Sequence, residues 1–342
     1  MATGPLFSVV IATYGRADFV TKTIDSVLRQ TEESFEIVII DDGSVDHTRE
    51  ALGPYEGRIR YFYQENQGMA RARNRGIREA RGEFVALLDS DDLWEARYLE
   101  EVRKVFEQYP ETGAVFVAER DIDAQGVRRS RVYGKRSEGR WFTPISMIST
   151  DTRVGSGRLP VVRRALLTEF GAYDVGLCGA WDSELWIRLS FQVPMTVVPE
   201  PLVLRRRHKG NYSSDKVKDG KAWLVILDRV ARDRPEFARD HAWALRRARS
   251  KSFLRVGRSL LARSAEEPDQ LPEARHYLRR ALLLYPLFLR AWSYLAIGLA
   301  APSSYQRLHD LGVRIVDRMN LGPRRTLRTP PAEPDHHWSR GT

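Results

Sequence analysis

The sequence predicts an α/β protein with a Rossmann-like, mostly parallel sheet flanked by helices and followed by a C-terminal α-helical extension. Between residue 7 and about residue 120, short β-branched runs alternate with amphipathic stretches, as in parallel sheets. Clusters of polar residues follow the predicted strands at four places. With 342 residues, 42% of them hydrophobic, the chain can bury a full-sized core.

The first part of the chain supplies the strands and helices in turn. Strands are expected at residues 7–12, 35–41, 58–64, 84–92 and 114–119, and helices at 18–30, from about 46, at 69–80 and at 98–108. From about 121 to 220 the pattern gives way to loops rich in Gly, Pro, Ser and Arg, with helical islands at 163–170 and 180–190. We expect this region to form a lid packed on the sheet.

The remainder of the chain is predicted to be helical to about residue 320. The expected domains are therefore a catalytic domain at 1–220, a helical extension at 221–320 and a disordered tail at 321–342. Residues 272–301 resemble one tetratricopeptide-type hairpin, with Ala281, Pro286 and Trp292 at suitable places. A solenoid needs about three such units, so this is a hairpin alone.

The charge of the chain limits its expected partners, and its cysteine content indicates the expected cellular compartment. The net charge of +10 favours anionic partners, but no nucleic-acid-binding pattern accompanies the arginines, so no specific nucleic-acid contact is expected. The single cysteine, Cys178, and the absence of a signal-peptide pattern at the start predict a cytoplasmic protein. Pro286 and Arg290 interrupt the apolar run 282–301, so a packed helical hairpin is expected there in place of a membrane-spanning helix. Basic residues such as Arg279, Arg280 and Arg290 could attract anionic lipid, so peripheral contact with the inner membrane face is a further hypothesis.

The strongest motif is an acidic turn after the predicted strand at 84–92. Asp89, Asp91 and Asp92 place three carboxylates within four residues, and such crowded charges need a cation or a basic group. Mg²⁺ or Mn²⁺ uses few protein carboxylates when phosphate oxygens and water complete its shell. The alternative is a solvated turn in which Asp92 caps the next helix.

A second acidic pair ends the predicted strand at 35–41. Asp41 and Asp42 could accept hydrogen bonds from a ribose hydroxyl or a base N–H, as acids after second strands do in dinucleotide folds. A turn with Asp46 as the helix N-cap would explain the same residues.

Two further clusters lie beyond other strands. Residues 12–16, which include Ala12, Thr13, Tyr14 and Arg16, offer a hydroxyl, an aromatic face and a guanidinium for a base and a phosphate. Residues 66–76 place three arginines, among them Arg73, at one helix start. Because open α/β sheets bind ligands beyond the carboxyl ends of their strands, all four clusters should share one cleft.

Together these segments resemble the signature of family 2 glycosyltransferases with the GT-A fold. The resemblance rests on VVIATYGR, IVIIDDGSVDHT, NQGMARARNRGI and FVALLDSDDLW and covers about residues 7–210. It implies an inverting transferase that uses a nucleotide-diphosphate sugar and a divalent metal, Mg²⁺ or Mn²⁺, to glycosylate a glycan or a lipid-linked acceptor. The implied donor-binding residues are Ala12, Thr13, Tyr14, Arg16, Asp41, Asp42, Arg73, Asp89 and Ser90. The implied metal ligands are Asp89, Asp91 and His208.

Residues 179–189 resemble the family's catalytic-base segment, with one departure. Trp181 stands where the first of two adjacent acids is usual, which leaves Asp182 as the matching base and Glu184 as the other candidate. A base must lie within hydrogen-bond reach of the acceptor hydroxyl. Trp181 is then expected to contact the acceptor. The alternative is a purely structural role, in which Asp182 only begins a helix with a buried face.

Residues 205–213 resemble the family's basic loop that closes the site. Departure of a nucleotide diphosphate builds negative charge, which Arg205, Arg207 and Lys209 are expected to stabilise. A charge run is otherwise a solvated surface.

Two other functions compete with an active transferase. The missing acid before Asp182 also suits an inactive subunit that binds sugar nucleotides. A nucleotidyltransferase is disfavoured because ATYGR stands where a Gly-rich, Lys-containing phosphate loop would follow the first strand.

Overall fold

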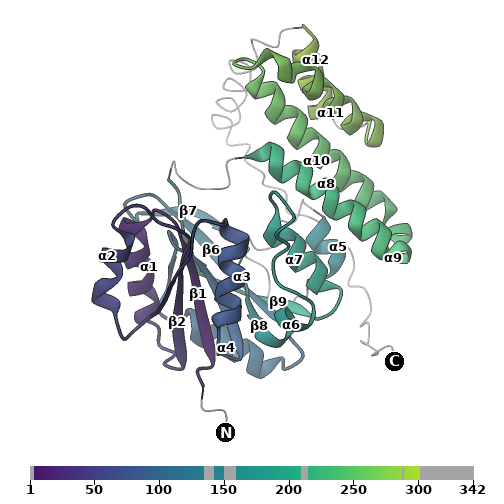
Figure 1. Cartoon of the computed structure of the whole chain (residues 1–342). Helices are drawn as coiled ribbons and strands as arrows, with labels where there is room; N and C mark the ends of the chain where they lie inside the picture. The colour runs from purple at the N-terminus through teal and green to yellow at the C-terminus, as the bar shows by residue number, and fades with distance from the viewer. Residues whose placement is uncertain (1–3, 135–141, 150–158, 209–214, 287–288, 301–342) are drawn as a thin grey trace.

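A computed structural model describes residues 4–134, 142–149, 159–208, 215–286 and 289–300 (Figure 1). The strands are β1 (Phe7–Thr13), β2 (Phe35–Asp41), β3 (Arg60–Tyr63), β4 (Phe84–Asp89), β5 (Leu93–Trp94), β6 (Ala114–Ile122), β7 (Arg128–Tyr133), β8 (Val161–Arg163) and β9 (Met195–Arg206). The helices are α1 (Ala17–Leu28), α2 (Thr48–Leu52), α3 (Met69–Glu79), α4 (Tyr98–Gln108), α5 (Pro144–Ile148), α6 (Arg164–Glu169), α7 (Trp181–Ser190), α8 (Lys216–Asp233), α9 (Pro235–Asp240), α10 (Ala242–Arg263), α11 (Leu271–Leu284) and α12 (Leu289–Ala300).

The described strands form one mixed sheet with the order β3-β2-β1-β4-β8-β6-β9-β5, and β7 pairs with β6. Strands β3, β2, β1 and β4 run parallel to one another, and β6 runs parallel to β9. Strand β8 runs antiparallel between β4 and β6. The predicted α/β class, a mostly parallel sheet flanked by helices, is confirmed.

Alternation along the strands fills a core on each face of the sheet. Val9 and Ile11 of β1 pack on one face with α1, α2 and α4, whereas Val10 packs on the other with α3, α6 and α7. Both faces of the central strands are therefore covered, which explains their unbroken apolar runs. Figure 1 shows α1 and α3 on opposite sides of β1 and β2.

The region 121–220 differs from the prediction because it contributes three strands as well as loops. Strand β9 runs parallel to β6 although it contains Pro199 and Pro201, which made the segment look like a loop. The register shifts near Val117 and Ala118 absorb the extra residues of β9. A bulge of this kind lets proline occupy a strand that would otherwise need its N–H in the ladder.

Helices α8 to α12, residues 216–300, form an arm beside the sheet (Figure 1). Trp223, Ile226 and Leu227 of α8 pack in one buried cluster with Ile148 of α5 and Ile187 of α7. The expected domain boundary after residue 220 falls inside α8, so the helix that begins the arm also covers the sheet-bearing part. No helix in the described segments combines the length and apolarity needed to cross a bilayer.

Candidate active site

Three strand ends meet at the carboxyl edge of the sheet. The register of β1 places Ala12 opposite Asp89 of β4 and Thr13 opposite Asp41 of β2. Thr13, Asp41 and Asp89 are the last residues of these three parallel strands. The polar clusters that follow β1, β2 and β4 are therefore neighbours, as expected for a ligand site in an open α/β sheet.

The acidic turn brings its three carboxylates together. Strand β4 ends at Asp89, and the N–H of Asp92 donates to the Asp89 carbonyl at 3.1 Å. One carboxylate oxygen from each of Asp89, Asp91 and Asp92 lies within 4.8 Å of the others. Burial, and then the charge of Asp89, raises the pKa of Asp91, and the same causes together with Asp91 raise the pKa of Asp92 well above its usual range.

Asp92 is not a helix cap. Helix α4 begins at Tyr98 after Arg97, and the Asp92 carboxylate instead accepts the backbone N–H of Arg206 at 2.8 Å. The alternative of a solvated capping turn is therefore wrong. Burial and neighbouring carboxylates oppose the ionisation of Asp91 and Asp92, and a hard divalent cation, which takes oxygen ligands, would offset that repulsion.

Two basic side chains meet Asp91 on the side of the loop after β1. His208 Nε2 lies 2.8 Å from Asp91 Oδ2 and 2.8 Å from Arg16 Nη1, while Arg16 Nη1 lies 3.3 Å from the same carboxylate oxygen. His208 also packs on the ring of Phe19, with ring centroids 4.9 Å apart. The structure thus brings His208 and Arg16 to the acidic turn.

Arg73 joins the acidic turn to the catalytic-base segment. Its guanidinium donates from Nη2 to Asp89 Oδ1 at 2.6 Å and from Nη1 to Asp182 Oδ1 at 2.8 Å. The side chain is 6% exposed. Burial acts to lower the pKa of Arg73, but the charge of Asp182 and its other acidic neighbours outweighs burial and raises it. The arginine therefore stays charged between two carboxylates.

Asp182 has a second donor, Tyr173. The Tyr173 hydroxyl donates to Asp182 Oδ1 at 3.0 Å, and burial followed by the charge of Asp182 raises the pKa of Tyr173 well above its usual range. Asn74 holds the backbone of Tyr173 through two hydrogen bonds of 2.8 Å, one to its carbonyl and one from its N–H. Neighbouring residues of α3 thus orient Asp182 and its tyrosine partner.

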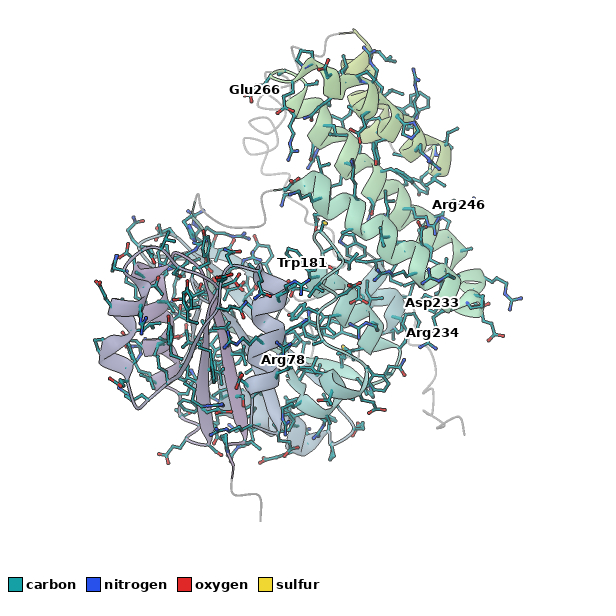
Figure 2. The ribbon with its side chains drawn as sticks, in the orientation of Figure 1. Arg78, Trp181, Asp233, Arg234, Arg246 and Glu266 are labelled. Atoms are coloured by element: carbon teal, nitrogen blue, oxygen red, sulfur yellow. The ribbon has the colours of Figure 1, made fainter. Side chains whose placement is uncertain are left out.

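The other candidates on α7 are placed differently. Glu184 is buried, and its two carboxylate oxygens accept hydrogen bonds from Arg188 at 2.8 Å and 3.0 Å. Arg188 also donates to the three backbone carbonyls of residues 170–172. Trp181 is half-buried, and its Nε1 donates to the Leu177 carbonyl at 2.5 Å. Figure 2 shows Trp181 where the arm meets the sheet-bearing part.

Asp41 and Asp42 are both buried and bound within the protein. Asp41 accepts the Ser44 N–H at 2.9 Å and the Tyr61 hydroxyl at 2.8 Å. Asp42 accepts from the Gln64 side chain and from the backbone N–H groups of residues 67 and 68. The pair fixes the loops around the site.

The loop after β1 borders an open space. Thr13 is buried, and its hydroxyl has no hydrogen-bond partner within the described structure, whereas Tyr14 is 51% exposed. A cavity of about 360 Å³ is lined by residues 15–19 together with Asp46 and His47. Ser90 is buried behind the acidic turn, where its carbonyl accepts the Thr23 hydroxyl at 3.0 Å.

Asp46 ties the starts of two helices together, in place of a simple N-cap. Its carboxylate accepts the backbone N–H of Thr48 at 3.1 Å and that of Ala17 at 3.3 Å. The residue that precedes α2 is His47, which makes no side-chain cap.

The basic residues after β9 divide between two places. Arg205 and Arg207 both bind Asp121 of β6, and the guanidinium of Arg205 also covers the Tyr133 ring at 4.6 Å. Arg206 turns the other way, and its Nε donates to the Asp91 carbonyl at 2.9 Å. Alternation of side chains along a strand explains the division. Lys209 lies outside the described residues.

Two residues that meet the predicted site, Arg206 and Tyr173, were not among the site residues expected from the sequence, whereas Asp92 was part of the acidic motif. Arg206 stands between expected residues, and the alternation of the Arg205–Arg207 run was a usable signal for it. Nothing in the local sequence around Tyr173 predicts a site residue, because its contact with Asp182 depends on the hydrogen bonds by which Asn74 of α3 holds the loop before α7.

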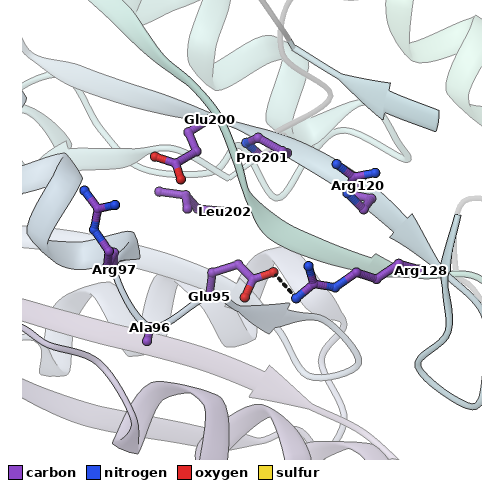
Figure 3. A pocket seen from close by; sticks show the side chains of 8 residues that line it. All are labelled: Glu95, Ala96, Arg97, Arg120, Arg128, Glu200, Pro201 and Leu202. Carbon is purple, nitrogen blue, oxygen red and sulfur yellow. Dashed lines mark ion pairs between the residues drawn. The ribbon is translucent and has the colours of Figure 1, made fainter. Parts of the chain in front are cut away.

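A second cavity, of about 370 Å³, lies apart from these residues (Figure 3). It is lined by Glu95, Ala96, Arg97, Arg120, Arg128, Glu200, Pro201 and Leu202. An ion pair of 2.7 Å joins Glu95 to Arg128 across it. None of the expected site residues lines this cavity, so it does not belong to the predicted donor site.

The fold is that of an α/β protein with a carboxylate-rich candidate ligand site at the carboxyl edge of its sheet. Residues 8–171 match the model of glycosyl transferase family 2. The family that the motifs predicted is therefore the one whose model this part of the chain matches, and the fold is the predicted GT-A fold.

Relatives and solved structures agree with this assignment. An uncharacterised glycosyltransferase of Rickettsia felis is 49% identical over 89 residues, which are 25% of this chain and 15% of that protein. Another from Rickettsia typhi is 27% identical over 235 residues, 67% of this chain and 73% of that protein. The chain thus spans only a small part of the first of these relatives.

Two solved structures share the fold. S. aureus TarS 1–349 in complex with UDP-GlcNAc superimposes with a TM-score of 0.62 at 18% identity, covering 88% of this chain and 91% of that chain. The mannosyltransferase PcManGT from Pyrobaculum calidifontis, in complex with GDP-Man and Mn²⁺, gives a TM-score of 0.55 at 22% identity, covering 95% and 89%.

Proposed function

We propose that the protein transfers a sugar from a nucleotide-diphosphate donor to a glycan or lipid-linked acceptor, with metal assistance and inversion at the anomeric carbon. The observation that carries this proposal is the double contact of Arg73 with Asp89 and Asp182. It places the candidate base beside the acidic turn, so a sugar bound at that turn would lie within reach of both.

The donor is proposed to be a nucleotide-diphosphate sugar. Thr13 and Tyr14 directly precede residues 15–19, which line the cavity after β1, and the exposed Tyr14 ring suits stacking on a nucleobase. Asp41 and Asp42 would support this wall mainly by fixing the loops. TarS and PcManGT carry UDP-GlcNAc and GDP-Man, so the likeness supports the donor class and leaves the base open.

The metal is proposed to be Mg²⁺ or Mn²⁺. Asp89 and Asp91, with Asp92 behind them, offer the oxygen ligands, and His208 lies against Asp91. When bound, a divalent ion neutralises the charge of the diphosphate. Manganese in the PcManGT complex supports this assignment.

Asp182 is the proposed general base. Its Oδ1 is fixed by Arg73 and Tyr173, which holds the carboxylate in one orientation for a hydroxyl that attacks opposite the diphosphate. Both oxygens of Glu184 are engaged with Arg188, which argues against Glu184 as the base. Direct displacement by one hydroxyl inverts the anomeric carbon.

Other residues complete the proposed roles. Arg16 and His208, which meet at Asp91, are better placed for the leaving diphosphate than Arg205 and Arg207, which bind Asp121. Trp181, one residue before the base, would contact the acceptor. The lone Cys178 suits a reducing compartment, so we place the reaction in the cytoplasm, at the inner membrane face when the acceptor is lipid-linked.

A single-turnover assay of Asp182→Asn against Glu184→Gln tests the base. Asp182→Asn should abolish transfer and Glu184→Gln should retain it, with the donor bound in both variants. Unchanged transfer by Asp182→Asn would remove the proposed base. If the wild-type protein binds a donor but transfers sugar to no acceptor, the alternative of an inactive binding subunit is favoured. Trp181, which stands where the family usually has an acid, is the feature that supports this alternative.

Thermal shifts with nucleotide diphosphates, with and without Mn²⁺, test the donor and the metal separately. Binding to the native state raises the unfolding temperature by mass action. We expect the largest rise with nucleotide and metal together. If no nucleotide diphosphate stabilises the protein, the donor assignment fails.

A further inference from the structure

The last three helices of the arm carry an unusual charge pattern. Helix α10 contains seven Lys and Arg residues and no Asp or Glu. Between residues 274 and 309 the sequence again contains no acidic residue. Because a globular surface usually mixes both signs, a surface this one-sided indicates an anionic partner.

Part of this charge is used inside the arm. Arg249, Arg255 and Arg263 of α10 pair with Asp228, Asp219 and Asp215 at 2.6, 2.5 and 3.0 Å. These three arginines hold α10 on α8 and its N-cap. Arg246, Arg279 and Arg280 differ, since all three are exposed and no carboxylate of the described structure lies within ion-pair distance of them.

Aromatic side chains gather where α10 begins and α11 ends. The rings of Trp243 and Tyr285 lie 6.4 Å apart, edge to face, and the Arg247 guanidinium covers Trp243 at 5.4 Å. Trp292 Nε1 donates to the Pro286 carbonyl at 2.9 Å. One contiguous set of contacts therefore links the ends of three helices.

This end of the arm is also exposed. Trp243 is 62% exposed, Trp292 is 53% exposed and Leu283 is 81% exposed. Large apolar side chains at these levels are costly in water unless something covers them. We name the set Trp243, Arg246, Arg279, Arg280, Leu283 and Trp292 the arm tip.

The acids near the arm tip are Asp233, Glu236 and Asp240 of α8 and α9, and only the first two form ion pairs within the described structure. Figure 2 shows Glu266 at the opposite end of the arm from Arg246, with Asp233 and Arg234 nearer to Arg246. Asp233 pairs with Arg232 at 2.7 Å, and Glu236 with Arg239 at 3.8 Å. Ion pairs offset two of these three acids, so positive charge exceeds negative charge among the exposed side chains at this end of the arm.

We propose that the arm tip docks on the surface of an anionic lipid bilayer. Tryptophan rings are enriched at the membrane interface, where an apolar body and a polar N–H are both satisfied, and arginine can bury its stem while its head meets phosphate. Each basic side chain near an anionic surface adds attraction that salt weakens. The tip would hold the site at a membrane, and this role does not depend on whether the protein transfers a sugar.

The test uses the full-length protein in vesicle flotation. The probes are phosphatidylcholine vesicles and vesicles in which a third of that lipid is replaced by phosphatidylglycerol. Wild-type protein should float with the anionic vesicles only, and less so at high salt. The triple variant Arg246→Glu, Arg279→Glu, Arg280→Glu and the double variant Trp243→Ser, Trp292→Ser should each bind at least about tenfold more weakly.

The matched control reverses three exposed arginines of the sheet-bearing part, Arg29→Glu, Arg58→Glu and Arg78→Glu, and should keep vesicle binding. Donor binding, followed by thermal shift, should be unchanged in all variants, which separates this proposal from the proposed function. Equal binding to both vesicle types, or equal loss in control and tip variants, overturns it. The proposal also fails if the wild-type protein self-associates and never floats with vesicles, while the tip variants are monomeric.

Discussion

Arg73 Nη1 lies 2.8 Å from Asp182 Oδ1, and Nη2 of the same guanidinium lies 2.6 Å from Asp89 Oδ1. One buried arginine thus fixes the distance between the acidic turn and the proposed base. Two carboxylates at such a distance would repel without the intervening cation. The planar fork of arginine can bind both at once, which a lysine ammonium on a single stem does less well.

Arg73→Lys should therefore preserve folding but slow the single-turnover rate about a hundredfold, since lysine keeps the charge and loses the two-point alignment. Rapid-quench measurement at saturating donor checks this. Arg75→Lys on the same helix is the matched control, because Arg75 donates to the Tyr63 carbonyl and the Gln64 side chain. A wild-type rate in Arg73→Lys would remove the alignment role.

Tyr173→Phe should move the acidic limb of the kcat/KM profile up by about one pH unit. The Tyr173 hydroxyl donates to the ionised Asp182 carboxylate, and a hydrogen bond to a charged form favours that form. Without it the base holds its proton to higher pH, so activity at low pH is lost first.

Tyr55→Phe is the control for that profile, because the Tyr55 hydroxyl donates to Asp25 at 2.8 Å in an equivalent pair away from the site. Its acidic limb should stay where it is in the wild type. An unmoved limb in Tyr173→Phe, or the same movement in both variants, contradicts a positioning role for Tyr173.

The strands and helices of the first part were predictable because local patterns decide them. The apolar run before Asp41 and the run before Asp89 became β2 and β4, and both acids mark the strand ends. Strand β9 was missed because its two prolines speak against a strand locally, while the bulged pairing with β6 that accommodates them depends on residues some eighty positions earlier.

The site divides in the same way. The acidic turn, Arg16 and His208 could be placed together from the motifs, although the partners of each acid could not. Asp41 and Asp42 illustrate the limit, since their sequence suits ligand binding and capping equally, and only the fold shows them bound to Tyr61 and to the 64–68 loop. The side chains of Arg205 and Arg206 point in opposite directions because they are neighbours on a strand. The sequence predicted a loop there, so this alternation was not expected.

Glu36→Gln should lower the free energy of unfolding by about 1–3 kcal/mol at neutral pH. Although burial opposes it, hydrogen bonds from the Ser8 hydroxyl at 2.6 Å and the Arg81 N–H at 2.7 Å, with Arg60, lower the pKa of Glu36 in the fold. The stabilisation is present above the ordinary pKa of 4.5 and is lost as pH falls through the lower native value.

Urea unfolding of both proteins across acidic and neutral pH measures this. The difference between wild type and Glu36→Gln should shrink as the pH falls below the ordinary range of a glutamate. A difference that grows on acidification would show that the carboxylate is not stabilised in its ionised form.

Trp223→Ala should lower the free energy of unfolding by about 3–5 kcal/mol, as other large buried truncations do. Trp223 is 8% exposed in the cluster that joins α8 to α5 and α7, whereas Trp243 at the arm tip is 62% exposed. Trp243→Ala should change stability by no more than about 0.5 kcal/mol. Equal losses in the two variants would show that α8 does not stabilise the sheet-bearing part.

Ala180→Gly should raise the free energy of unfolding by about 0.5–1 kcal/mol. Ala180, which precedes the helix of Asp182, has a φ of 50°, the positive value that costs a non-glycine residue about 1–2 kcal/mol. Glycine relieves that strain. Because glycine is more flexible in the unfolded chain, about 0.5–1 kcal/mol of the stabilisation is lost again.

Gly179→Ala should act in the opposite direction. Gly179 has a φ of 145°, and an added Cβ would lie 3.2 Å from the Asp219 nitrogen and 3.3 Å from its Cα, both in the backbone of α8. The expected loss is about 1–3 kcal/mol, because α8 must move away from the base-bearing segment. Denaturant unfolding of both variants decides the matter. A gain from Gly179→Ala, or a loss from Ala180→Gly, would mean that the conformation before Asp182 is not the strained one, and that α8 does not confine it.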